Sequence, residues 1–323
     1  MSEERIEVEV PEDVRGKRLD VYLAGVAGSR SAARRWILKG CVEVEGRRAK
    51  PALSVTPGMR IRILPPEPEP LLPYPEDIPL DILFEDPYLL VLNKPPGLPV
   101  HPGAGRRSGT LVHALLAHCR GLSGVGGPTR PGIVHRLDKG TSGVMAVAKD
   151  DEVHRALSEQ WKGHTVFRRY LAFAWGRMRE RRGVVDAPVG RHPRDRKRMA
   201  VVEGGRPAWT EYEVLEEYEF LSLLALYPKT GRTHQIRVHL SHIGHPVFGD
   251  PKYGGRTKRL GGLPPRERRG AEELLELIPR QALHAEVLGL VHPVAGRYME
   301  FRADLPEDMM ALRETLRGRR WGT

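Results

Sequence analysis

The ten residues HRLDKGTSGV, at positions 135–144, contain the strongest candidate for chemistry in this chain. Asp138 stands there between two cations, Arg136 and Lys139, just before an apolar stretch. A carboxylate among cations, on a turn that opens a buried strand, can be kept ionised and aimed at a substrate. Asp138 is therefore a candidate nucleophile or general base. An isolated aspartate more often caps a helix or pairs with a neighbouring arginine, so further residues must support this role.

Two other segments offer that support. The segment KTGRTHQIRVH, at 229–239, places Arg232, His234, Arg237 and His239 around the expected start of a helix. An arginine there can meet Asp138 across a cleft and favour its charged form, although the same cations could form a phosphate site with no catalytic part. Tyr170 follows two arginines and opens an apolar strand, so it could stack on a base while the arginines hold phosphate. Taken alone, Tyr170 is more typical of an aromatic side chain that packs in the core next to its strand.

The sequence predicts neither a metal nor a cofactor. None of the 13 histidines belongs to an HExxH or a zinc-type spacing. The glycines form neither GxGxxG between a strand and a helix nor GxxxxGK[ST], and Ser142 lacks the GxSxG elbow. A hydrolase that uses Asp138 as a base beside a histidine-bound metal remains a third, weaker alternative.

The elements that must position these residues follow from hydrophobic periodicity and turn signals. Strands are expected at 88–92, 143–148, 170–175, 221–227, 283–291 and 298–301, and helices at 110–119, 150–161 and 233–243. Strands outnumber helices and their spacing is irregular. This pattern predicts an α+β fold with a mixed sheet and not a doubly wound one.

The chain is expected to divide into an N-terminal extension (1–15), a small basic domain (16–64), a proline-rich linker (65–79) and a large domain (80–323). The small domain combines two short helices with a small ribbon, and its second helix carries Arg30, Arg34, Arg35 and Lys39. The formal net charge is +11, which suits a polyanion partner such as a nucleic acid. An ordinary solvated helix face explains the four cations equally well.

Localisation is expected to be cytoplasmic. No apolar run is long enough to cross a membrane, and the acidic N-terminus lacks the apolar core of a secretory signal. The two cysteines, Cys41 and Cys119, lie far apart and form no disulfide framework or CxxC site.

Taken together, the motifs resemble the RluA/RluD family of RNA pseudouridine synthases. The matching segments are LNKPPGLPVHPGAG (92–105), GIVHRLDKGTSGVMAVAKD (132–150), RRYLAFAWG (168–176), RHPRDRKRMAV (191–201), KTGRTHQIRVHLSHIGHPVFGDPKYGG (229–255) and RQALHAEVLGLVHP (280–293). They follow the family order, and the N-terminal domain resembles an S4 RNA-binding domain. Gly140 departs from the family pattern, which commonly has an acidic residue there, and this departure predicts a looser turn after Asp138.

The resemblance implies an isomerase that converts uridines of structured RNA to pseudouridine without a cofactor. Asp138 matches the catalytic aspartate, Tyr170 the tyrosine that stacks on the uracil, and Arg237 the arginine that pairs with the aspartate. Arg136 matches the arginine that fills the space left by the flipped nucleotide, and Arg232 is a further expected RNA contact. The implied large domain has a largely antiparallel central sheet with flanking helices and loops.

The implied substrate is large-subunit ribosomal RNA, free or in an assembling subunit, and the chain is expected to be a monomer. The main alternative is a non-catalytic S4-type RNA-binding protein, in which the large domain is only a platform. Such a platform would not require Asp138, Tyr170 and Arg237 together with their flanking motifs.

Overall fold

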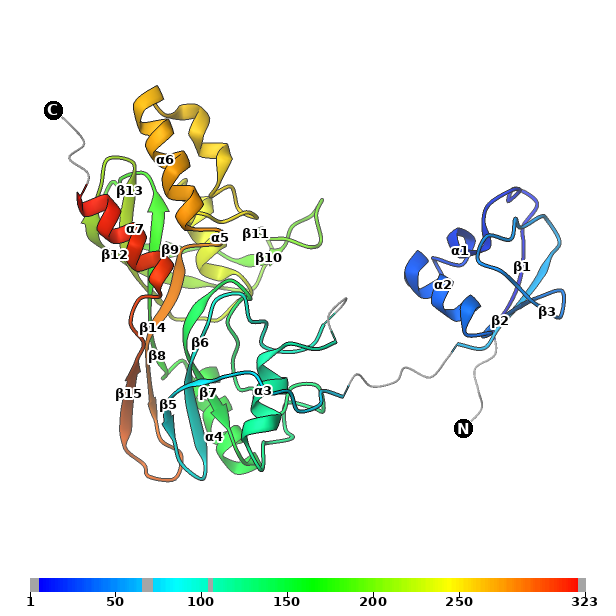
Figure 1. The fold of residues 1–323 in the computed structure, drawn as a ribbon, viewed down its shortest axis with the longest axis horizontal. Helices are drawn as coiled ribbons and strands as arrows, with labels where there is room; N and C mark the ends of the chain where they lie inside the picture. The colour runs from blue at the N-terminus through cyan, green and yellow to red at the C-terminus, as the bar shows by residue number, and fades with distance from the viewer. Residues whose placement is uncertain (1–5, 66–71, 104–106, 319–323) are drawn as a thin grey trace. The chain divides into compact units, whose positions relative to one another are not determined.

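The computed structural model describes residues 6–65, 72–103 and 107–318. The chain divides into two compact units, residues 1–70 and residues 71–323 (Figure 1). The expected linker begins at the end of the first unit, and its residues 66–71 lie outside the described ranges. Within those ranges, no helix combines the length and the apolar character needed to cross a bilayer.

The N-terminal unit is a four-stranded antiparallel sheet with two helices. Its elements are β1 (Ile6–Glu9), α1 (Leu19–Tyr22), α2 (Arg30–Leu38), β2 (Val42–Val44), β3 (Arg47–Arg48) and β4 (Arg60–Ile63), and the strand order is β1-β4-β2-β3. Helix α2 begins at Arg30 because the hydroxyl of Ser29 accepts a hydrogen bond from the Ala32 backbone, 3.1 Å away. Ala33 and Ile37 of α2 are buried against the sheet core.

The sequence division assigned residues 1–15 to a separate extension, but part of this segment belongs to the N-terminal unit. Strand β1 pairs with β4 in the register Val8 to Ile61, and Val10 is buried in the core of the unit. The alternation Ile-Glu-Val-Glu is the local signal for this strand. The N-terminal sheet is therefore completed by residues that the sequence division placed outside it.

The large unit is built on a nine-stranded sheet. Its strands are β5 (Asp81–Glu85), β6 (Leu89–Lys94), β7 (Ser142–Ala148), β8 (Phe167–Trp175), β9 (Arg182–Asp186), β12 (Trp209–Glu217), β13 (Leu221–Pro228), β14 (Leu283–Val291) and β15 (Tyr298–Arg302). The order is β5-β6-β7-β14-β8-β13-β12-β9, and β15 pairs with β14. The pair β7–β14 is parallel and the other described pairs are antiparallel, which confirms the expected mixed, largely antiparallel α+β sheet.

Helices cover both faces of this sheet, and a short hairpin stands apart from it. The helices are α3 (Leu111–His118), α4 (Asp151–Lys162), α5 (Gln235–His242), the 3-10 helix η1 (Thr257–Gly262), α6 (Pro265–Leu277) and α7 (Glu307–Gly318), and the hairpin consists of β10 (Val189–Arg191) and β11 (Met199–Val201). In β6, Leu89 and Val91 pack with α4, whereas Leu90 and Leu92 pack with α3. Burial on both faces explains why this strand is apolar at every position from 89 to 92.

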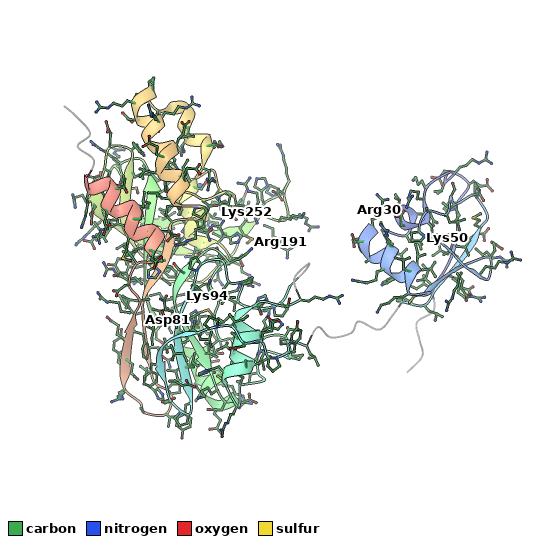
Figure 2. All side chains as sticks on the ribbon, in the orientation of Figure 1. Arg30, Lys50, Asp81, Lys94, Arg191 and Lys252 are labelled. Atoms are coloured by element: carbon green, nitrogen blue, oxygen red, sulfur yellow. The ribbon has the colours of Figure 1, made fainter. Side chains whose placement is uncertain are left out.

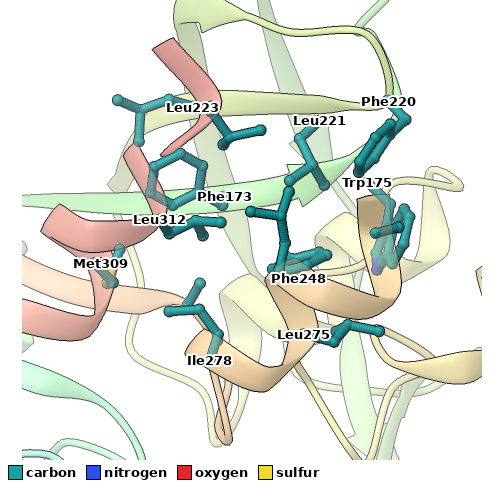
Figure 3. Packing of buried hydrophobic residues seen from close by; sticks show 14 of the residues in the cluster. Phe173, Trp175, Phe220, Leu221, Leu223, Phe248, Leu275, Ile278, Met309 and Leu312 are labelled. Carbon is teal, nitrogen blue, oxygen red and sulfur yellow. The ribbon is translucent and has the colours of Figure 1, made fainter. Parts of the chain in front are cut away.

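The other half of the sheet is covered in the same way. On one face of β8 and β13, Phe173 and Leu223 pack with Phe248 and with residues of α6 and α7 (Figure 3). On the opposite face, Ala172 and Leu224 pack against α5. This packing holds the start of α5 beside the sheet, next to the loop that carries Asp138.

Candidate active site

One pocket of about 250 Å³ contains the residues that the large domain was expected to contribute. It opens where the loop 134–141, strand β8 and the segment before α5 meet. Its lining includes Asp138, Tyr170, Arg136, Arg232 and Arg237. The structure therefore brings together side chains that are separated by as many as a hundred positions in the chain.

Backbone contacts hold the loop of Asp138 from several sides. The Thr141 backbone donates to the Asp138 carbonyl at 3.0 Å, which closes a turn. The Lys139 carbonyl accepts from the Gly97 backbone at 2.8 Å, and the Gly140 carbonyl accepts from Arg280 Nη1 at 2.9 Å. The direction of the Asp138 side chain is thus set by contacts with distant parts of the large unit.

A buried arginine joins Asp138 to a second carboxylate. Arg237 Nη1 donates to Asp138 Oδ2 at 2.8 Å, while its Nε and Nη2 donate to the two oxygens of Asp250 at 2.7 and 2.9 Å. The Arg237 side chain is 6% exposed, and that of Asp138 is 19% exposed. The two-point contact with Asp250 fixes the plane of the guanidinium and leaves Nη1 aimed at Asp138.

Asp250 was given no role by sequence reasoning. It lies in the turn after Gly249, is fully buried, and also accepts hydrogen bonds from the Lys252 and Tyr253 backbones at 2.8 and 3.2 Å. An aspartate in a glycine-rich turn usually caps the local backbone, and Asp250 does so as well. Its second task, the contact with Arg237, leaves no signal in the local sequence.

Tyr170 lies near the start of β8, between β13 and β14, where it is the register partner of Leu226 and Ala285. The structure begins β8 at Phe167, three residues before the expected start, so the preceding arginines are part of the strand. Burial raises the pKa of the Tyr170 phenol; the positive charge of Arg168 opposes this shift, and the negative charge of Asp138 adds to it. At neutral pH, Tyr170 is therefore a phenol and not a phenolate.

Two further arginines lie at the outer part of the pocket. Arg136 is exposed, and its Nη1 lies 2.9 Å from His101 Nε2. Arg232 Nε donates to the Pro207 carbonyl at 3.0 Å. Both side chains can meet phosphate or a base edge at the mouth of the pocket without displacing the pair of Asp138 and Arg237.

Comparison with known proteins places this arrangement in a family. The family model for RNA pseudouridylate synthase matches residues 88–242, and the model for the S4 domain matches residues 17–61. A ribosomal large subunit pseudouridine synthase D from Nitrosomonas europaea is 46% identical over 98% of this chain and 89% of the relative. This chain belongs to the RNA pseudouridine synthase family. The expected resemblance to the RluA/RluD family and the expected S4 domain are confirmed.

Other comparisons agree. An uncharacterised RNA pseudouridine synthase from Bacillus subtilis is 43% identical over 97% of this chain and 98% of the relative. The solved structure of human RNA pseudouridylate synthase domain containing 4 has a TM-score of 0.54 and 30% sequence identity, and the match covers 73% of this chain and 93% of that one. The chain is an RNA pseudouridine synthase, which is an isomerase.

The departure at Gly140 has a local compensation in this synthase. A side chain at position 140 would place its Cβ 2.7 Å from Gln281 Oε1, so Gln281 occupies that space. Gln281 Nε2 in turn donates to Thr141 Oγ1 at 3.1 Å. The turn after Asp138 is therefore packed and hydrogen-bonded at Gly140, in contrast to the looser turn that the sequence predicted.

A buried lysine near the loop of Asp138 was missed by sequence reasoning. Lys94, at the end of β6, is fully buried, and its ammonium donates to the carbonyls of Pro95 and Leu98 at 2.8 and 3.0 Å (Figure 2). A third carbonyl, that of Lys139, lies 3.4 Å away and belongs to the loop of Asp138. Burial lowers the pKa of Lys94 to about 7; the positive charge of Arg280 adds to this shift and Asp138 opposes it.

The four basic residues expected to contact RNA in the S4 domain lie on or just after α2 and are exposed. Among them, Arg30 is already engaged, because its Nε donates to Asp20 Oδ2 at 3.2 Å. Arg34 and Arg35 lie on the exposed part of the same helix. In the part of the chain that the structure describes, no group of three or more His, Cys, Asp or Glu side chains is placed to hold a metal ion.

Proposed function

We propose that this synthase converts uridines of large-subunit ribosomal RNA to pseudouridine and that Asp138 is its catalytic carboxylate. The observation that carries the proposal is the single pocket in which Asp138, Arg237 and Tyr170 meet. The named relatives from Nitrosomonas europaea and Escherichia coli O157:H7, which are ribosomal large subunit pseudouridine synthases D, support the choice of RNA. Either free ribosomal RNA or an assembling subunit fits this substrate class.

The reaction explains the types of the pocket residues. The bond from N1 of uracil to C1′ of ribose breaks, the uracil turns, a bond forms from C5 to C1′, and the proton on C5 is lost while N1 gains one. Electrons and atoms balance without a redox partner or a group donor. An ionised carboxylate can attack C1′, attack C6, or remove the proton on C2′, and all three routes begin from the same Asp138 anion.

Arg237 supplies the counter-charge that this anion needs. Its Nη1 places positive charge against Oδ2 of Asp138 and leaves Oδ1 outside the guanidinium contact. Because Asp250 holds the other side of Arg237, the cation keeps its position while charge changes on Asp138. Fixed charges of this kind stabilise a reaction without having to reorganise.

The target uracil must leave its stack to reach Asp138, at a cost of a few kcal/mol. Stacking on Tyr170 offsets part of this cost, and Arg136 at the pocket mouth can fill the space that the nucleotide leaves. Tyr170 is also the candidate acceptor of the C5 proton. Since it enters the reaction as a phenol, its own hydroxyl proton must leave first, and N1 of the detached uracil is the site of the reaction that gains a proton.

The S4 domain supplies affinity for structured RNA. Its exposed cations on α2, together with Arg232 at the pocket, provide phosphate contacts, so binding should weaken as salt rises. Deletion of residues 1–64 should reduce RNA affinity or site choice more than the rate of the chemical step. Unchanged efficiency on full-length ribosomal RNA would contradict this assignment. We extend the proposal to a monomer in the cytoplasm, the compartment that ribosomal RNA and two unpaired cysteines favour.

The direct test compares wild-type protein with Asp138→Asn, which keeps the size of the side chain and removes its charge. Pseudouridine is measured in ribosomal RNA after incubation, and RNA binding is measured in parallel. The variant should bind RNA normally and form no product. Equal product from both proteins would refute the role of Asp138. Absence of product from wild-type protein on large-subunit RNA would favour a different RNA or the non-catalytic alternative, and mapping pseudouridines in cells with and without the gene decides between these two.

A further inference from the structure

A histidine of the pocket, His234, has an unusual backbone and a defined hydrogen-bond partner. It precedes α5 with φ 58° and ψ 19°, the left-handed region, and its side chain is 18% exposed and lines the pocket. A residue other than glycine in this region is strained by roughly 1–2 kcal/mol. Such strain persists where the surrounding structure imposes it, often at functional sites. The strained backbone directs attention to what the imidazole does.

The hydrogen bonds of Tyr253 favour one of the two neutral tautomers of His234. The Met199 backbone N–H donates to the Tyr253 hydroxyl oxygen at 3.0 Å, and the same oxygen lies 2.7 Å from His234 Nδ1. A backbone N–H can only donate, so the tyrosine accepts from Met199 and has its own proton to give. Giving it to Nδ1 satisfies both groups. The neutral imidazole then carries its proton on Nε2.

That second nitrogen faces the catalytic carboxylate. His234 Nε2 lies 3.7 Å from Oδ1 of Asp138, the oxygen that Arg237 does not contact. This separation is longer than a hydrogen bond, and contacts between catalytic groups commonly shorten in the complex with substrate. The two carboxylate oxygens therefore have different neighbours: a permanent cation at Oδ2 and a neutral N–H donor at Oδ1.

We propose that His234 is a positioning residue for Asp138: its neutral imidazole donates from Nε2 to Oδ1, and Tyr253 selects the required tautomer. The proposal rests on the catalytic role proposed for Asp138. A neutral donor orients Oδ1 without adding a second full positive charge beside the anion. Asp138 thus remains reactive while the hydrogen bond fixes the orientation of Oδ1.

The charges around His234 favour the neutral form. Burial lowers its pKa, and the nearby cations Arg237 and Lys252 act in the same direction. The carboxylates of Asp138 and Asp250 oppose this shift. Because the net shift is downward, the imidazole is uncharged at neutral pH, as the hydrogen bond from Tyr253 also requires.

Tyr253 is itself held from two sides. Its ring lies against the guanidinium groups of Arg237 and Arg198, at 5.0 and 5.3 Å from the ring centre. The neighbouring Lys252 donates to the Lys197 carbonyl in the loop between β10 and β11. The hydroxyl of Tyr253 therefore stays in place to control His234.

Two substitutions of His234 separate the proposed role from a merely structural one. In His234→Gln the side-chain amide reaches the position of Nε2 and can donate there, whereas in His234→Asn it reaches only the position of Nδ1. Asparagine adopts the left-handed backbone more readily than glutamine, so a purely structural role would favour Asn. We expect His234→Gln to keep kcat within about tenfold of wild type. His234→Asn should lower kcat about 100-fold with little change in KM.

Tyr253→Phe provides an independent readout. Removing the hydroxyl removes the donor that keeps Nδ1 unprotonated, so the acid limb of the kcat profile should move to higher pH. Urea unfolding of each variant shows whether the large unit, which contains both residues, is folded. The proposal is overturned if His234→Asn is as active as His234→Gln, if only KM changes, or if the pH profile of Tyr253→Phe equals that of wild type. An active Asp138→Asn would instead refute the catalytic role itself, so the two failures are distinguishable.

Discussion

Lys94 offers a quantitative test of the electrostatics beneath the Asp138 loop. It is the largest fully buried side chain described, and its pKa is lowered by burial from 10.5 to about 7. Between these two pH values the unfolded chain binds a proton that the folded chain has largely released. The free energy of unfolding must therefore rise with pH across this window, since the charged form is disfavoured in the fold.

The magnitude follows from the size of the gap. At roughly 1.4 kcal/mol per pH unit, the whole interval from 10.5 down to about 7 corresponds to about 5 kcal/mol. From pH 7 to pH 9 the folded lysine completes its loss of the proton while the unfolded one keeps it. Over that pH range Lys94 should increase the free energy of unfolding by about 2 kcal/mol.

The perturbation is Lys94→Met, which keeps the length of the side chain and removes the titrating group. Urea unfolding of both proteins is followed at pH 7, 8 and 9 at constant ionic strength. Methionine leaves three carbonyls without their donor, and this loss is independent of pH. We expect wild type to gain about 2 kcal/mol relative to the variant between pH 7 and pH 9.

Lys162→Met is the matched control, because the Lys162 side chain is 78% exposed. Its stability relative to wild type should not change over the same pH range. If the difference in the free energy of unfolding between wild type and Lys94→Met also does not change with pH, then Lys94 stays protonated in the folded protein. That result would refute the argument from burial.

Three further predictions concern the large unit. Asp250→Asn should lower kcat about 100-fold with unchanged RNA affinity, because Arg237 loses its fixed partner. Single-turnover kinetics measure the loss of kcat, and a change confined to KM would contradict the prediction. Gly143→Ala should destabilise the large unit by about 3 kcal/mol or more, because the added Cβ would lie 2.1 Å from the Ala285 carbonyl oxygen. An unchanged midpoint of urea unfolding would contradict this close approach. Burial raises the pKa of Glu216, but hydrogen bonds from two arginines and a tyrosine outweigh it and lower the value from 4.5 to about 2. Its stabilising effect is therefore complete above pH 4.5 and is lost as pH falls towards 2, and the acid unfolding of Glu216→Gln should lack that component.

Most of the strands that sequence reasoning found in the large unit are buried on both faces, although β15, with exposed Tyr298 and Glu300, is an exception. The segments at 89–92 and 144–148 are continuous apolar runs for this reason. Strand β12, WTEYEVLEE, was missed because charged residues interrupt it, although pairing with β9 and β13 makes it a strand. Helix α6 was also missed, despite the helical spacing of its buried Ala271, Leu274 and Leu275.

Sequence reasoning named candidate site residues whose chemistry is visible in their own segment. Asp138, Tyr170 and Arg237 stand in motifs, so their types and order could be read. Asp250 and His234 could not be assigned in the same way. One is an ordinary turn aspartate and the other an ordinary histidine until their distances to Arg237 and Asp138 are known.

The sequence by itself determined the family, the fold class and the candidate carboxylate, because motif order and hydrophobic pattern are properties of neighbouring residues. Only the tertiary structure decided which groups surround that carboxylate. Arg237 reaches Asp138 at the angle that Asp250 imposes, and Gln281 fills the space at Gly140. Electrostatic and steric effects act over a few ångströms of space, so they depend on contacts between segments that no local pattern records.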